Sequence, residues 1–146
     1  MVSLQQRLVS ILRDVLPVAE EPDGGLTVHH DGTVASLQVV NIFEGLELVA
    51  LTQILAWDLP LTKKISDEVA AQARANNFGS VTLLEKGAEK TAQRNSGKGA
   101  ATRASKTADV MLRYNFPGAG LSDEALRTLI LLVLDSGAWM RTALTS

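Results

Sequence analysis

The sequence predicts an α+β domain with three helices and an antiparallel sheet of about five strands, in the order α-β-β-β-α-β-β-α. Apolar residues recur at helical spacing in three segments, two near the ends of the chain and one in its middle. Between them lie runs rich in Val, Ile, Thr and Leu that are bounded by Gly, Pro, Asn and Asp, as strands are. The 146 residues fit one domain, residues 1–146, that can bury a core without disulfides or metals.

The first predicted helix begins after Ser3 and ends before Pro17. Ser3 and Gln6 have the spacing of a capping box, in which each side chain bonds to the backbone N–H of the other residue. Pro17 ends the helix because proline disfavours the helical conformation of the residue before it. The apolar side chains follow helical spacing: Leu4, Leu8, Ile11, Leu12, Val15 and Leu16.

Three strands are predicted next, over residues 26–30, 33–42 and 46–57. The Asp31-Gly32 dipeptide between the first two is favoured in two-residue hairpin turns. In the third strand apolar residues occupy even and odd positions alike, so both of its faces need cover. The apolar residues at its odd positions are Val49, Leu51, Leu55 and Trp57.

The second half of the chain predicts a helix over residues 62–76, strands over 80–85 and 107–116, and a long helix over 123–144. The last strand alternates apolar and polar residues, which predicts one buried face. Ser122 precedes two acidic residues at the start of the long helix, and both a capping hydroxyl and negative charge stabilise a helix N-terminus.

The last helix is apolar on almost every side, since residues 129–134 are all apolar and successive positions step around the helix axis. One side can face the sheet, and the other needs cover from another helix of the same chain or from a second molecule. We expect a second molecule, bound by the last helix and the third strand as a dimer interface or a groove for a partner segment. The residues predicted for this interface are Val49, Leu51, Leu55, Trp57, Leu131, Leu132 and Trp139.

The net charge of −2 hides an uneven distribution. Residues 1–60 carry two Arg against eight acidic residues, whereas residues 86–113 carry seven Lys and Arg against two acidic residues. We expect a flexible, solvated basic hairpin loop at about 87–106, where large apolar residues are almost absent. The loop has no aromatic residue on which a base can stack, which favours an acidic protein over nucleic acid as its ligand. The basic residues available for such contacts include Lys90, Arg94, Lys98 and Arg103.

No catalytic, metal or cofactor site is predicted. The absence of cysteine excludes thiol chemistry and Cys-ligated metals. His29 and His30 are adjacent on a strand and point to opposite faces, so they do not share one metal ion. Residues 96–99 read Ser-Gly-Lys-Gly but lack the first glycine and the final hydroxyl residue of a phosphate-binding loop. The acidic pair Asp123-Glu124 is explained by its place at a helix start.

The run Leu-Arg-Tyr-Asn-Phe-Pro-Gly-Ala-Gly-Leu-Ser-Asp-Glu-Ala-Leu at residues 112–126, with the element order, resembles the bacterial YbjN family, which is grouped with type III secretion chaperone-like proteins. Residues 76–79, Asn-Asn-Phe-Gly, are similar to that family's Asn-rich helix end before a strand. The resemblance covers about residues 4–144. It implies three helices on one antiparallel sheet, a homodimer and a chaperone-like or regulatory role in binding an extended partner, and it implies no catalytic residue.

Together these observations predict a non-enzymatic protein- or peptide-binding module, chaperone-like or regulatory, that acts as a homodimer without a cofactor. The alternative is a nucleic-acid-associated regulator that uses the basic residues 86–106. We expect a cytoplasmic protein, because charged residues interrupt the first helix as they do not in a signal peptide. No apolar stretch is long enough to insert into a membrane.

Overall fold

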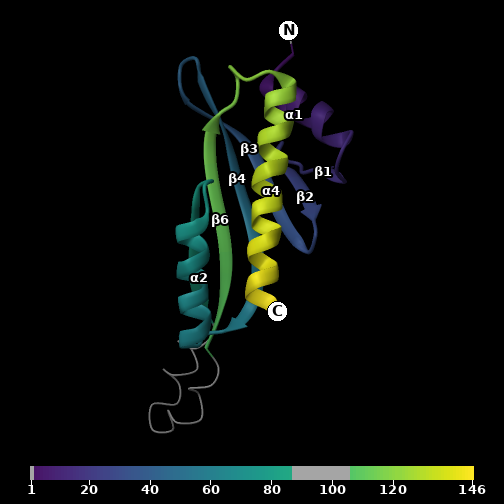
Figure 1. The fold of residues 1–146 in the computed structure, drawn as a ribbon. Helices are drawn as coiled ribbons and strands as arrows, with labels where there is room; N and C mark the ends of the chain where they lie inside the picture. The colour runs from purple at the N-terminus through teal and green to yellow at the C-terminus, as the bar shows by residue number, and fades with distance from the viewer. Residues whose placement is uncertain (1, 87–105) are drawn as a thin grey trace.

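The computed structural model describes residues 2–86 and 106–146. Within these ranges three helices pack on one face of a six-stranded antiparallel sheet (Figure 1). The helices are α1 (Leu4–Arg13), α2 (Lys63–Ala75) and α4 (Asp123–Thr145). The strands are β1 (Val18–Glu20), β2 (Leu26–His30), β3 (Thr33–Phe43), β4 (Leu46–Pro60), β5 (Ser80–Lys86) and β6 (Thr107–Pro117).

The predicted α+β class is confirmed, but the sheet has six strands and not five. The additional strand is β1, which pairs with β2 from Val18 opposite Val28 to Glu20 opposite Leu26. It is only three residues long, so it is too short to show the alternation by which a strand is predicted from sequence. The other elements follow the predicted order.

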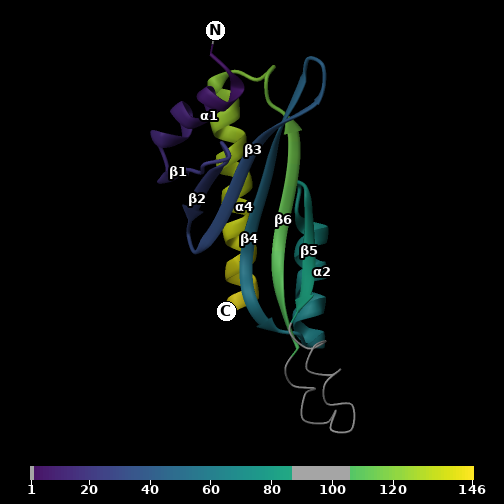
Figure 2. The same ribbon diagram turned by 180° about the vertical axis from the view of Figure 1, so that it is seen from behind.

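The strands lie in the order β1-β2-β3-β4-β6-β5, and every neighbouring pair is antiparallel. β6 therefore lies between β4 and β5, and β5 forms one edge of the sheet. In Figure 2 the sheet is seen from behind, with the helices on its far side. One face of the sheet thus packs against the helices, and the other face has no helix over it within the described residues.

The core lies between the helices and the sheet. α4 runs across the middle of the sheet, and its inward side includes the fully buried Leu126, Ile130, Val133 and Leu134 (Figure 1). Opposite them, the odd positions of β4 point into the same layer. Val49, Leu51 and Leu55 are each 0% exposed there.

The burial of these three β4 residues corrects the prediction that they lie at an interface. The helix that covers this face of β4 belongs to the same chain, which is the alternative that the sequence left open. The even positions face the other way and are partly exposed, among them Leu48, Ala50, Thr52 and Ile54.

The polar side chains of Gln53 and Thr33 are both buried in this core. The Gln53 amide nitrogen donates to the hydroxyl of Thr33 at 2.8 Å and to the carbonyl of Leu134 at 3.1 Å. The Thr33 hydroxyl in turn donates to the carbonyl of His30 at 2.7 Å. These bonds connect β2, β3, β4 and α4 and favour this position of α4 along the sheet, because their loss would leave more buried polar groups unpaired. The Gln53 side-chain oxygen already has no hydrogen-bond partner among the described residues.

The predicted caps of the first and last helices are present. Ser3 and Gln6 form the capping box of α1, and the hydroxyl of Ser122 accepts from the backbone N–H of Ala125. α2 is capped by Thr62. No helix of the described ranges is both long and apolar enough to cross a membrane.

Candidate functional site

The residues predicted for an interface do not form one surface. Trp57 is 43% exposed, and strand alternation after the buried Ala56 places it on the uncovered face of the sheet. Leu132 and Trp139 are exposed on α4, in the opposite layer, and Leu131 is half-buried. Four predicted basic contacts lie outside the described residues: Lys90, Arg94, Lys98 and Arg103.

The two edges of the sheet differ in how readily they can pair with another strand. β1 offers only three residues, and Pro17 and Pro22 lie close to its two ends. The guanidinium of Arg13 also pairs with the Glu20 carboxylate of this strand at 2.8 Å. A short edge that is bounded by proline and carries charge is protected against further pairing.

The opposite edge, β5, has none of these protections along most of its length. It contains seven residues and no proline, and its charged residues, Glu85 and Lys86, are confined to one end. In an antiparallel ladder, alternate residues direct their N–H and C=O groups away from the partner strand. No strand of the described ranges pairs with the outer side of β5, so these groups are available to a strand of another molecule.

The ammonium of Lys86, at the end of β5, is bound by two carboxylates of the same sheet. The ammonium of Lys86 lies 2.9 Å from carboxylate oxygens of Asp58 and Asp109, and the backbone N–H of Asp58 donates to Asp109 at 3.0 Å. The bonds to Asp58 and Asp109 raise the pKa of Lys86 above its ordinary value. Burial raises the pKa of Asp109, but the bonds from Asp58 and Lys86 outweigh this effect and lower it. The Lys86 ammonium therefore forms its ion pairs within its own chain, with Asp58 and Asp109.

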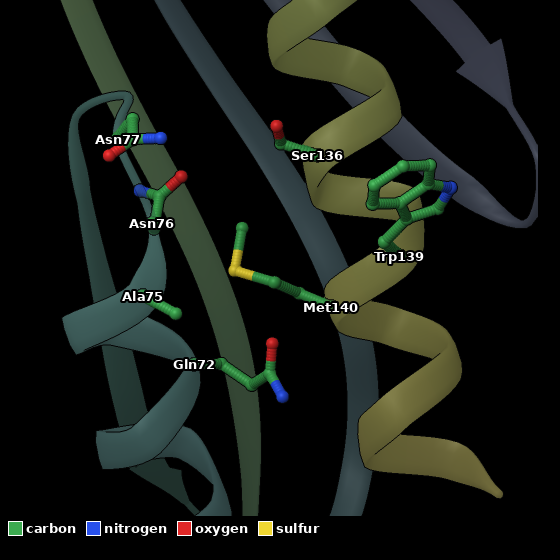
Figure 3. A pocket seen from close by; sticks show the side chains of 7 residues that line it. All are labelled: Gln72, Ala75, Asn76, Asn77, Ser136, Trp139 and Met140. Carbon is green, nitrogen blue, oxygen red and sulfur yellow. The ribbon is translucent and has the colours of Figure 1, made fainter.

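α2 lies beside β5 and carries a row of side chains that faces away from α4. In Figure 3 the Gln72 side chain points from α2 toward α4. With 3.6 residues per turn, Lys63, Asp67, Ala70 and Arg74 lie on the other side of the helix. All four are exposed, and Lys63 pairs with Asp67 at 2.8 Å. We call Lys63, Asp67, Ala70 and Arg74 the outer row of α2.

A pocket of about 250 Å³ separates α2 from α4 (Figure 3). Met140 points across it from α4 toward α2, and the Trp139 ring lies on the α4 side (Figure 3). The other side chains lining it are Gln72, Ala75, Asn76, Asn77 and Ser136. Since the lining carries no ionisable side chain, this pocket offers no general acid or base.

The uncovered face of the sheet has an apolar region near the end where β5 terminates. Register places Ile54 opposite Met111 and Val34, and Trp57 and Leu84 lie farther along the same face. At the other end of β4 the β3–β4 hairpin carries exposed apolar residues, of which Phe43 is 74% exposed. Exposed apolar side chains thus occur in two separate regions, near the two ends of β4.

The edge position of β5 is the feature that the sequence did not reveal. Residues 80–85 were predicted to form a strand, but the position of that strand in the sheet depends on β6 inserting between β4 and β5. A strand order set by non-local pairing leaves no local signal in composition or periodicity. The absence of proline in this strand is the one hint, because it leaves the edge open.

A scan against models of known protein families, a search of curated proteins and a search of solved structures each found no match.

Proposed function

We propose that this protein is a non-enzymatic protein-binding module, chaperone-like or regulatory, whose subunits pair as a homodimer along β5 and α2. The observation that carries the proposal is the open seven-residue edge of β5, beside the exposed outer row of α2. The resemblance of residues 112–126 to the YbjN family favours the same type of function.

The sequence of β5 suits pairing with a second copy of itself. An antiparallel pair centred on Leu83 places Thr82 opposite the partner's Leu84 and Ser80 opposite the partner's Lys86. In this register the two Glu85 side chains lie at opposite ends of the pair, and so do the two Lys86 side chains. Like charges are therefore never directly opposite each other, the arrangement that destabilises cross-strand pairs.

The outer row of α2 is complementary in charge to the outer row of a second copy, about an axis at a similar height along the sheet. Two antiparallel copies of α2 related by an axis near Ala70 place Asp67 beside the partner's Arg74, twice by symmetry. Ala70 lies ~8 Å along α2 from Ala75, where the helix ends. Leu83 lies ~10 Å along β5 from Ser80, where the strand begins. A single two-fold axis can therefore relate both layers, which favours a second copy over an unrelated extended segment.

Such a dimer joins the two sheets edge to edge and keeps all helices on one side. The uncovered faces then form one continuous surface, on which Trp57, Leu84 and Ile54 of each copy are available to a protein partner. An interface is enriched in aromatic residues and Met relative to the rest of a protein surface, and Trp57 and Met111 are of these types.

Sedimentation equilibrium of the full chain tests the dimer. We expect a mass of about 31 kDa, twice the 15.6 kDa of the chain, that falls toward the monomer on dilution. The substitutions Thr82→Pro and Leu83→Pro each remove one backbone N–H from β5. Adjacent N–H groups of a strand point to opposite sides, so one of the two substitutions removes a donor that points outward. A monomer at high micromolar concentration for the unaltered chain contradicts the proposal.

Capture of a partner from the native cell tests the binding surface. The full chain is compared with Trp57→Ala, on the uncovered sheet face, and with Trp139→Ala, on the opposite layer. Both residues are exposed tryptophans, so each is a control for the other. We expect Trp57→Ala to lose the partner and Trp139→Ala to keep it, and the reverse result contradicts the assignment of the surface.

A further inference from the structure

The turn between β2 and β3 packs beside α4 and brings three potential metal ligands together. His30 is the last residue of β2, Asp31 begins the turn, and Asp135 lies in the middle of α4. The imidazole Nε2 of His30 lies 2.8 Å from Oδ1 of Asp135 and 3.7 Å from Oδ2 of Asp31. One ligand atom from each of the three side chains lies within 4.8 Å of the other two.

The three side chains differ in exposure in a way that suits a binding site. The imidazole of His30 is 15% exposed, and its backbone is held by the bond from the Thr33 hydroxyl. The carboxylates of Asp31 and Asp135 are mostly exposed and can rotate about a fixed backbone. An ion can therefore be approached by two exposed carboxylates and one mostly buried imidazole nitrogen.

The two carboxylates of the cluster form no ion pair with a lysine or arginine of the described ranges. Within the described ranges no Lys or Arg lies within 4.0 Å of the carboxylate of Asp31 or of Asp135, and each has only His30 as a nearby basic group. Arg141, which lies farther along α4 beside Gly32, donates instead to the carbonyl of Leu55 at 2.9 Å. A cation that binds here therefore does not have to displace a lysine or arginine of the described ranges from either carboxylate.

The chemistry of the three ligand atoms determines which metal ion they favour. Zinc binds imidazole nitrogen at ~2.0–2.1 Å and carboxylate oxygen at ~2.0–2.2 Å, so two ligands of one zinc ion lie about 3–3.5 Å apart. The 2.8 and 3.7 Å separations bracket this distance. Calcium prefers six to eight oxygens, whereas imidazole suits zinc and similar transition metals.

We propose that His30, Asp31 and Asp135 bind one Zn²⁺ or chemically similar divalent ion, which joins the β2–β3 turn to α4. Water completes the coordination, because three protein ligands leave a tetrahedral ion one position open. His29 has no part in this site, since it points to the uncovered face. The third ligand, Asp135, is distant in sequence from the histidine pair, and only the packing of α4 on the sheet brings it near.

Titration calorimetry of the full chain with Zn²⁺ in a non-chelating buffer at neutral pH tests the proposal. We expect saturable one-to-one binding and a rise in the melting temperature on adding zinc. Asp135→Asn keeps the size of the side chain but weakens the ligand, and it should reduce the affinity at least about tenfold. His29→Ala is the matched control and should bind zinc as the unaltered chain does.

Cobalt provides a second readout, because Co²⁺ bound in place of zinc absorbs visible light with an intensity that reports its coordination. We expect the absorption to be lost in His30→Ala and kept in His29→Ala. Binding only at millimolar zinc, or equal affinity in Asp135→Asn, overturns the proposal. It is also overturned if Asp135→Asn lowers the melting temperature while zinc stabilises no variant, since the three residues then act only as a hydrogen-bonded contact.

Discussion

Gly137 of α4 lies against the buried side-chain amide of Gln53. A Cβ at position 137 would overlap the side-chain oxygen Oε1 of Gln53. The Gln53 amide nitrogen is bonded to Thr33 and Leu134, so this side chain cannot turn away without losing both bonds. The absence of a side chain at position 137 is therefore what lets α4 approach β4 at this point.

We expect Gly137→Ala to destabilise the fold by about 1–3 kcal/mol, the usual cost of overpacking a core. In an exposed helix the same substitution stabilises by roughly 1 kcal/mol, so the predicted sign is opposite to helix propensity. Urea denaturation measures the difference. Gly120→Ala is the control, since a Cβ there meets no atom within 4 Å, and it should change the stability little.

The proposed pairing of Asp67 with the partner's Arg74 predicts the outcome of a charge exchange. Arg74→Glu places two acidic residues together at each of the two symmetric contacts and should raise the dimer dissociation constant about tenfold. Asp67→Arg combined with Arg74→Glu restores opposite charges and should recover most of the affinity. Sedimentation of the single and double variants measures both effects.

Lys64→Glu is the control for this exchange, because it changes charge on the same helix outside the outer row. If Arg74→Glu and Lys64→Glu weaken the dimer equally, the effect comes from net charge and not from the contact. If neither weakens a dimer that sedimentation detects, the subunits meet through another surface.

The lowered pKa of Asp109 predicts a loss of stability in acid. Its carboxylate favours the folded state when ionised, so its contribution is complete at neutral pH. The contribution is lost as the pH falls below about 4, the usual range for Asp, toward the lower pKa of the folded state. Asp109→Asn should cost about 1 kcal/mol or less at neutral pH, because the site is partly solvated.

The difference between the unaltered chain and Asp109→Asn should narrow as the pH falls from 5 to about 3. Denaturation curves at several pH values measure this change, with Glu44→Gln in the exposed β3–β4 turn as control. A difference that is constant with pH would show that the Asp109 charge does not contribute.

The contacts of Arg7 join α1 to the segment before α4, and a substitution of Arg7 tests their contribution to stability. Its guanidinium lies 2.8 Å from Asp123 and donates to the carbonyls of Ala119 and Leu121. Lysine keeps the charge but cannot direct several donors from a planar group. Arg7→Lys should therefore destabilise by about 1–3 kcal/mol. Arg13→Lys, at an exposed ion pair, should cost less than about 1 kcal/mol, and thermal melts compare the two.

Local sequence signals predicted the helix caps and the hairpin at Asp31-Gly32 because capping and turn residues act on their immediate neighbours. Which face of β4 is covered could not be predicted in the same way. Both faces of this strand are apolar in sequence, and only the position of α4 decides that Val49, Leu51 and Leu55 are buried while Leu48 and Ile54 are partly exposed.

The two candidate sites could not be predicted from the sequence for the same reason. β5 becomes an edge only because β6 inserts beside β4, and Asp135 meets His30 only because α4 crosses the sheet at that height. Both relationships join residues far apart in the chain. Patterns within a short window of sequence carry no information about them.

The strand order also decides when the chain can fold during synthesis. β5 has no partner until β6 has been made, and the buried side of β4 has no cover until α4 follows. The growing chain therefore exposes the apolar side of β4 until α4 is made, and it carries an unpaired β5 until β6 is made. Because these non-local contacts form late, folding is expected to be slow and to occur after α4 leaves the ribosome.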